Sequence, residues 1–175
     1  MSFLEIFRKL NNYIGTHKVH LCPAVKGRLM NHGKPLINAT ITRTLSYSDG
    51  KYTEDMCNTD NDGYFSMPEK SLRSSQPALL IAERFTSQRI YAHYYGDDYL
   101  LWSSQNSGIV LKPEYAIKLQ SLNGDIKDEE VLFSFKNINH SHRHEALSIC
   151  RWEDDFIIID AEAEFARMSQ GVLEE

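Results

Sequence analysis

The sequence predicts a mainly β protein built as a β-sandwich. Apolar and polar residues alternate over short stretches such as Val25 to Leu29 and Ala39 to Tyr47, which is the period of a half-buried strand. Clusters of turn-forming residues separate these stretches, at Asn31 to Pro35, Ser48 to Gly50 and Asp60 to Gly63. A chain of 175 residues suits one domain with an extension, and it can bury a core without disulfide bonds.

The first segment has helical spacing. Ser2 and Glu5 form a capping box, apolar residues follow at intervals of three and four, and Gly15 is a natural stop. We therefore expect an amphipathic helix within residues 1–18. The helical stretch, residues 2–14, carries only two basic residues, Arg8 and Lys9, which favours docking on the protein over binding to a membrane surface or a partner helix.

Residues 19–122 are expected to form the sandwich. Residues 38–47 alternate regularly except at Arg43, which interrupts the apolar side and suggests a sheet edge or a position near the rim. Thr59 to Met67 is predicted to be a tight turn that closes a hairpin and restarts a strand, which Pro68 ends. Further strands are expected at 51–58, 78–82, 88–95, 99–102, 108–111 and 114–122, with a Ser/Asn-rich loop after Trp102.

Residues 123–175 are expected to add strands and a short helix that pack on the sandwich. Asn123-Gly124 is the strongest short hairpin signal in the chain. Strands are predicted at 131–138, 146–152 and 156–161, and helical spacing resumes from Ala161 to Val172.

Charge and cysteine content narrow the class of protein. The net charge of −5 argues against a nucleic-acid binder, whose footprint would be basic. Cys22, Cys57 and Cys150 lie far apart in the sequence, which favours free thiols in a reducing compartment over a disulfide framework or a zinc site. The N-terminus lacks the pattern of a secretory signal and no apolar run could span a membrane, so we expect a cytoplasmic protein without a bound cofactor.

Three motifs in the first half carry a family resemblance. They are Val25-x-Gly27-x-Leu29, Gly33-x-Pro35-Leu36-x-Asn38-Ala39-x-Ile41 and Thr59-Asp60-x-Asp62-Gly63-x-Phe65. Together they resemble the transthyretin-like, carboxypeptidase-regulatory-like β-sandwich family, over roughly residues 19–120. The resemblance implies a sandwich that serves as a binding, adhesion or accessory module, and it says less about role than about fold. The related hydroxyisourate hydrolases end in a Tyr-Arg-Gly-Ser-type sequence, which Gly171 to Glu175 does not match.

A stand-alone module of this size also resembles bacterial immunity proteins found beside polymorphic toxins and type VI secretion effectors. That resemblance implies a non-enzymatic protein that neutralises a cognate toxin by direct binding. One alternative is an adaptor or accessory module of a secretion system or surface structure. Another is a metal-dependent enzyme built on His140, His142 and His144. The sequence does not predict the oligomeric state.

Aromatic and acidic residues are the candidate contacts for a protein partner. Trp152, Glu153, Asp154 and Asp155 place carboxylates beside an aromatic side chain, a composition suited to a basic partner. Trp102 is a second candidate anchor. The alternatives are a solvated turn for the acidic residues and a core-capping position for Trp102.

Two clusters have the composition of a metal site. On an extended segment, His140, His142 and His144 would lie on one face and within reach of one Zn²⁺ or Cu²⁺. The alternative is a polar loop between strands, and we expect no bound metal because no surrounding pattern supplies supporting hydrogen bonds. Asp60 to Gly63, with Glu69, is similar to a fragment of a calcium loop, but the neighbouring residues favour a turn.

Overall fold

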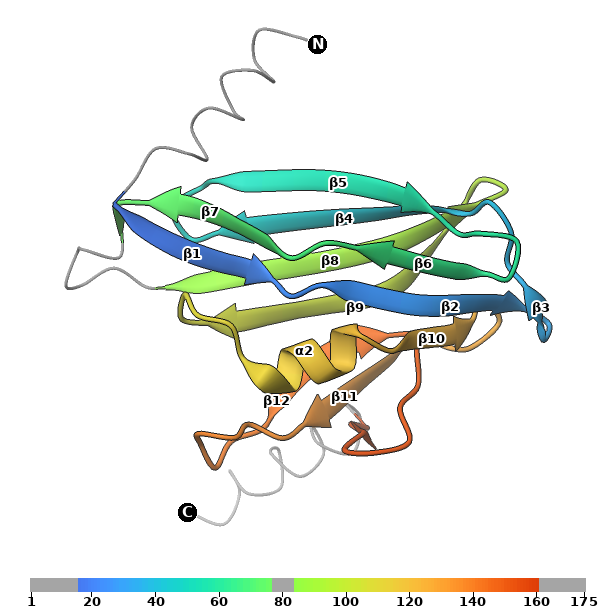
Figure 1. Ribbon diagram of the computed structural model, residues 1–175. Coiled ribbons are helices and arrows are strands. Elements are labelled where there is room, and N and C mark those ends of the chain that lie inside the picture. Colours follow the sequence, from blue (N-terminus) through green and yellow to red (C-terminus); the bar gives the residue numbers. More distant parts are fainter. Residues whose placement is uncertain (1–15, 77–83, 161–175) are drawn as a thin grey trace, which may run out of the picture.

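The computed structural model of the protein describes residues 16–76 and 84–160 (Figure 1). The helices predicted near the two termini and the strand predicted at 78–82 lie outside the described residues. The described part is mainly β, as the sequence predicts, and the strands form two facing layers with one short helix, α2 (Pro113–Leu119), beside them.

One layer is a sheet of seven strands, in the spatial order β13-β11-β12-β9-β8-β4-β5. Their bounds are β4 (Thr40–Tyr47), β5 (Tyr52–Asn58), β8 (Phe85–Tyr94), β9 (Asp97–Ser107), β11 (Val131–Phe135), β12 (His144–Ser148) and β13 (Ile157–Ile158). The strands predicted after residue 122 therefore extend the same sheet that the first half begins.

The facing layer consists of shorter strands. One pair joins β1 (His17–Cys22) to β7 (Lys70–Ser74). In the other group, β2 (Val25–Asn31) pairs with β3 (Lys34–Pro35), β6 (Tyr64–Met67) and β10 (Leu122–Asp125). The predicted alternation is confirmed, because Val25, Gly27 and Leu29 face the core.

Arg43 corrects the expectation of an edge position. It lies fully buried in β4, which is flanked by β5 and β8. Its guanidinium donates two hydrogen bonds to the carboxylate of Asp55, at 2.9 and 2.7 Å, and one to the carbonyl of Pro68 at 2.9 Å. A buried charge is tolerated when a partner charge and hydrogen bonds compensate it. Asp55 provides that compensation from the next strand.

The Thr59–Gly63 segment is a turn, but it does not close a hairpin. It carries the chain from β5 in the large sheet to β6, which pairs with β2 in the facing layer. The carboxylate of Asp60 accepts the backbone N–H groups of Asp62 at 2.9 Å and Tyr64 at 2.8 Å. Gly63 is required here, because its φ is +80° and a Cβ would lie 2.4 Å from the carbonyl oxygen of Leu29.

The second half departs from the predicted strands in three places. Residues 103–107 continue β9 instead of forming a loop, and 108–111 is not a strand. Residues 113–119 form α2, with Pro113 at its first turn and Tyr115 and Leu119 buried four residues apart. Residues 114–119, which were expected to alternate as a strand, therefore have helical spacing instead.

Asn123-Gly124 is not a hairpin turn. Both residues lie inside β10, which pairs with β2 in parallel. The side-chain oxygen of Asn123 accepts the backbone N–H of Arg28 at 3.0 Å. A Cβ at Gly124 would lie 3.3 Å from the Cα of Cys150, so the glycine allows close packing of two backbones.

Candidate binding surfaces

Trp102 is not available to a partner. It is fully buried in β9, where its indole N–H donates to the side-chain oxygen of Gln88 at 3.0 Å. Its ring packs edge-on against Tyr115 and Phe133, with centroid distances of 6.0 and 6.1 Å. The core alternative for Trp102 is therefore correct, and the prediction of a contact residue is wrong.

Trp152 belongs to the same aromatic cluster. It is half-buried, and its ring lies 4.9 Å from that of Phe133 and 5.6 Å from that of Phe156. Its indole N–H donates to the carbonyl of Lys118 at 3.1 Å, and the ammonium of Lys118 lies 5.4 Å above its ring. These contacts attach the loop before β13 to α2, so Trp152 has a structural role.

The three acidic residues that follow Trp152 have different contacts. Asp155 accepts the backbone N–H of Lys136 at 2.7 Å and forms an ion pair with Arg143. Burial opposes its ionisation, but the hydrogen bonds from Lys136 and Arg143 outweigh burial and lower the pKa of Asp155. Glu153, Asp154 and Asp155 are all exposed, but among the described residues only Asp155 of these three pairs its carboxylate with a neighbouring side chain.

The three histidines are split between two environments. The rings of His140 and His142 stack with their centroids 5.2 Å apart. His144 is buried in β12, and its Nε2 lies 3.0 Å from the carboxylate of Glu114 on α2. Within residues 16–76 and 84–160, no group of three or more His, Cys, Asp or Glu side chains is placed to hold a metal ion.

The buried Glu114–His144 pair joins α2 to the large sheet. Burial lowers the pKa of His144, against the opposing effect of Glu114. For Glu114, burial favours the neutral form, but hydrogen bonds from backbone N–H groups and from His144 outweigh it and lower the pKa. The histidine is thus held neutral and the carboxyl is held ionised.

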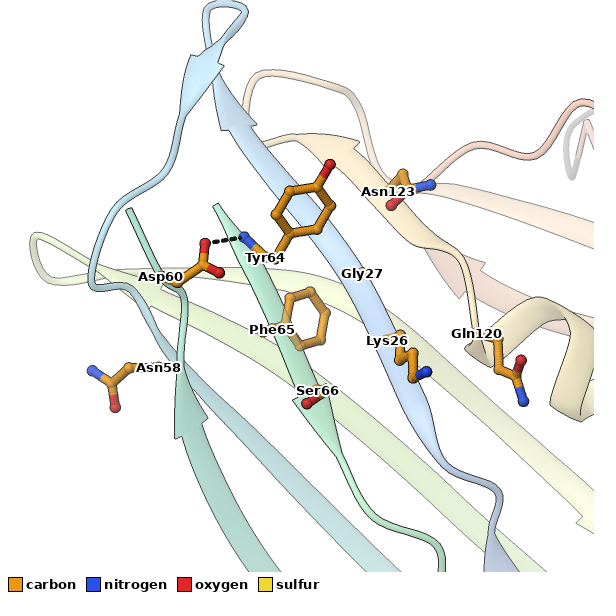
Figure 2. A pocket seen from close by; sticks show the side chains of 9 residues that line it. All are labelled: Lys26, Gly27, Asn58, Asp60, Tyr64, Phe65, Ser66, Gln120 and Asn123. Carbon is orange, nitrogen blue, oxygen red and sulfur yellow. Dashed lines mark hydrogen bonds between the residues drawn. The ribbon is translucent and has the colours of Figure 1, made fainter. Parts of the chain in front are cut away.

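A groove of about 660 Å³ lies on the facing layer, away from the predicted contact residues (Figure 2). It follows β2 and β6 and is bordered by the end of β5 and by the segment that links α2 to β10. The side chains and backbone that line it are Lys26, Gly27, Asn58, Asp60, Tyr64, Phe65, Ser66, Gln120 and Asn123.

Strand pairing explains how the groove is built. Lys26 lies opposite Ser66, and Arg28 lies opposite Tyr64, so these four residues share the outer face of the β2–β6 pair. The guanidinium of Arg28 lies 5.0 Å above the Tyr64 ring and donates to the carbonyl of Asp62 at 2.9 Å. Tyr64 is thereby held in place while about half of it, 51%, stays exposed.

The groove offers hydrogen-bonding groups that the rest of the described chain does not use. The side chains of Lys26, Ser66 and Gln120 are exposed, and none of them hydrogen-bonds to another described residue. Figure 2 shows Lys26 and Gln120 side by side at one end of the groove. An ammonium group, a hydroxyl group, amide groups and an aromatic ring together suit the recognition of a polar protein surface.

Sequence reasoning missed this surface because its residues alternate with core residues. Lys26, Arg28, Tyr64 and Ser66 each occupy the polar position of a half-buried strand, which any solvated sheet face would show. The pairing of β2 with β6, over a separation of nearly forty residues, is what gathers them. No local motif signals that pairing.

Among the described residues, no helix is long and apolar enough to cross a membrane.

Comparison with known proteins gives one family. Residues 25–129 match DUF6795, described as a domain of unknown function, and the match includes β5 and every residue that lines the groove. Searches among curated proteins and among solved structures gave no significant match. Because the matched region covers more than half of the chain, the protein belongs to the DUF6795 family.

Proposed function

We propose that this chain is a non-enzymatic protein-binding protein, most simply a bacterial immunity protein that neutralises a cognate toxin by direct binding. The observation that carries the proposal is the groove on β2 and β6. Its lining provides unused donors and acceptors on a rigid, hydrogen-bonded sheet, so a partner would meet a surface that is already ordered.

Charge near the groove favours a basic partner. Asp60 lines the groove, and the carboxylate of Asp125, on the strand that pairs with β2, accepts the backbone N–H of Gly33 at 2.8 Å. Asp128, Glu129 and Glu130 follow β10 in the sequence and add three carboxylates after this strand, which Figure 1 shows beside β2. Carboxylates around a contact raise the rate at which a basic protein associates.

The resemblance to transthyretin-like modules supports the same proposal. We assign the sandwich to that type on the strength of the three motifs in the first half, and such modules serve as binding domains. We propose the immunity role from the similarity to small proteins encoded beside toxins, and this role implies a cytoplasmic location.

The experiment is co-expression with the product of the adjacent gene. We expect this chain to protect cells from that product and to bind it in calorimetry. Ser66→Arg fills the groove and should abolish both, whereas Ser107→Arg, at an exposed position at the end of β9, should abolish neither.

Two results would contradict the proposal. Equal protection by the two arginine variants would exclude the groove as the contact. Secretion that depends on this chain, without binding to the adjacent product, would favour the adaptor role instead.

A further inference from the structure

Within residues 16–76 and 84–160, β5 is an edge strand with a neighbour on one side only. It ends the seven-stranded order, and within the described residues it pairs only with β4. Natural edges are blunted by proline, by charged residues that point outward or inward, by bulges or by short length. Of these features β5 has only charge, and its inward residue Asp55 is paired with Arg43. β5 is seven residues long, contains neither proline nor lysine, and keeps an unbroken register with β4.

The hydrogen-bond pattern shows which backbone groups face outward. Beyond the two ends of the β4–β5 pair, Tyr47 donates to Lys51 at 2.8 Å and Thr59 donates to Ala39 at 3.0 Å. In an antiparallel pair, hydrogen-bonded and non-bonded positions alternate. At both ends the residue that is hydrogen-bonded to the β4 side is odd-numbered, Lys51 at one end and Thr59 at the other. The odd-numbered residues of β5 therefore form the hydrogen bonds to β4. The N–H and C=O groups of Glu54, Met56 and Asn58 therefore point away from the sheet.

Side-chain contacts on the inner face of the sheet hold β5 against its neighbours. Asp55 turns inward, where its carboxylate bonds Arg43 and lies 3.1 Å from the ammonium of Lys70 on β7. Glu54 and Met56 stay exposed on the outer face, and Met56 is 66% exposed. The strand thus presents an ordered backbone with one acidic and one apolar side chain beside it.

We infer that β5 receives an extended segment of the partner protein as an added strand, with Lys or Arg facing Glu54 and an apolar residue beside Met56. This inference rests on the proposed function, because it names how the partner is held. Asn58 supports it, since this residue ends β5 and also lines the groove, so the two surfaces are continuous. Added strands gain affinity from backbone bonds and specificity from alternate side chains.

Charge favours a basic segment over a second copy of this chain. When two copies of β5 pair antiparallel about their centre, Glu54 lies diagonally across from the same residue of the other copy. Like charges at that distance are unfavourable, whereas an opposite charge is favourable. The net charge of −5 opposes self-association further.

The test uses the full chain and a defined probe. The probe is a nine-residue peptide of alternating threonine and valine with lysine at its centre. A control peptide of the same sequence carries glutamate at the central position. We expect the lysine peptide to shift the amide resonances of Glu54 and Met56 in NMR titrations. The glutamate peptide should bind roughly two- to fivefold more weakly.

Two variants separate the backbone contribution from the side chain. Met56→Pro removes an outward N–H and leaves the β4 ladder intact, so it should abolish peptide binding without unfolding the protein. Met56→Ala keeps that N–H and should retain most of the binding. Circular dichroism verifies that both variants fold.

Several outcomes would overturn the inference. These are equal binding by the alanine and proline variants, shifts confined to residues outside β5, no binding at millimolar peptide, or a dimer that Met56→Pro dissociates. The proposed function is judged separately, because Ser66→Arg blocks the groove and leaves β5 intact.

Discussion

The two edge strands of the seven-stranded sheet, β13 and β5, differ in how far their surroundings are covered by other side chains. At the β13 end, Trp152, Phe133 and Phe156 pack together, and Lys118 of α2 binds the loop carbonyl of Asp154 at 2.7 Å. At the β5 end, the strand is regular and its outer groups are exposed. Acidic and aromatic residues in a loop therefore stabilise the fold at one end, while a plain alternating strand leaves its outer groups exposed at the other, where we propose that the partner binds.

The difference comes from what each segment can bury. The loop before β13 contains large apolar rings, which gain most by leaving water. α2 provides hydrogen-bond partners for polar groups at this end of the sheet. Glu114 bonds the ring of His144, and Lys118 donates to the carbonyl of Asp154. β5 has charged or polar residues at most positions, so its outer groups remain in contact with solvent.

The largest expected effect is at the closed end. Trp102→Ala should lower the free energy of unfolding by about 3–5 kcal/mol, because it empties a buried site and leaves the side-chain oxygen of Gln88 without its donor. Urea denaturation measures this change. A loss below about 1 kcal/mol would contradict the core position of Trp102.

The next effect is at the open end, beneath β5. Asp55→Ala should cost about 3 kcal/mol, because it leaves the fully buried Arg43 without its carboxylate. Glu54→Ala is the matched control, since Glu54 is exposed, and it should change stability by no more than about 0.5 kcal/mol. Equal effects of the two substitutions in urea denaturation would show that the inward pair does not anchor the strand.

A smaller effect separates Trp152 from its acidic neighbours. Trp152→Ala should cost about 2 kcal/mol, since its half-buried ring packs on Phe133. Glu153→Ala should leave thermal stability within about 0.5 kcal/mol of the unchanged chain. If Trp152→Ala weakened partner binding without lowering stability, the acidic loop would again be the candidate contact.

The smallest effect is on pH dependence. Burial lowers the pKa of His144, so the unfolded chain binds a proton more readily than the folded chain does. Stability should therefore fall as the pH drops from about 7 towards 5, through the ordinary pKa of histidine near 6.5. Glu114, Lys112 and His142 are the charged groups that act on this ring.

His144→Gln should flatten part of that decline, measured as the melting temperature at several pH values. His20 remains in the variant and also has a lowered pKa through burial, so some decline should persist. An unchanged slope in His144→Gln would contradict a neutral, buried His144.

The sequence predicted the first half of the fold well, because its strands are half-buried and alternate. β2 and β4 follow the pattern residue by residue, and the Thr59–Gly63 turn lies where the glycine and Asp60 place it. It failed where tertiary contacts override local signals. Asn123-Gly124 is extended because β2 has a free side for β10, and Arg43 is buried because Asp55 faces it.

Candidate contact residues were harder to predict than the fold. The aromatic side chains of Trp102 and Trp152 suit a partner contact, but whether each lies in the core or on the surface depends on neighbours that are far away in sequence. Phe133 and Tyr115 provide those neighbours. The groove depends in the same way on the pairing of β2 with β6.

The most direct test of the account is amide hydrogen exchange of the full chain with and without the product of the adjacent gene. We expect the partner to slow exchange at Glu54, Met56 and Asn58, and at the exposed β6 residues Tyr64 and Ser66. Residues 152–155 should exchange at the same rate in both samples. Slowed exchange at 152–155, with no change in β5 and β6, would contradict the account.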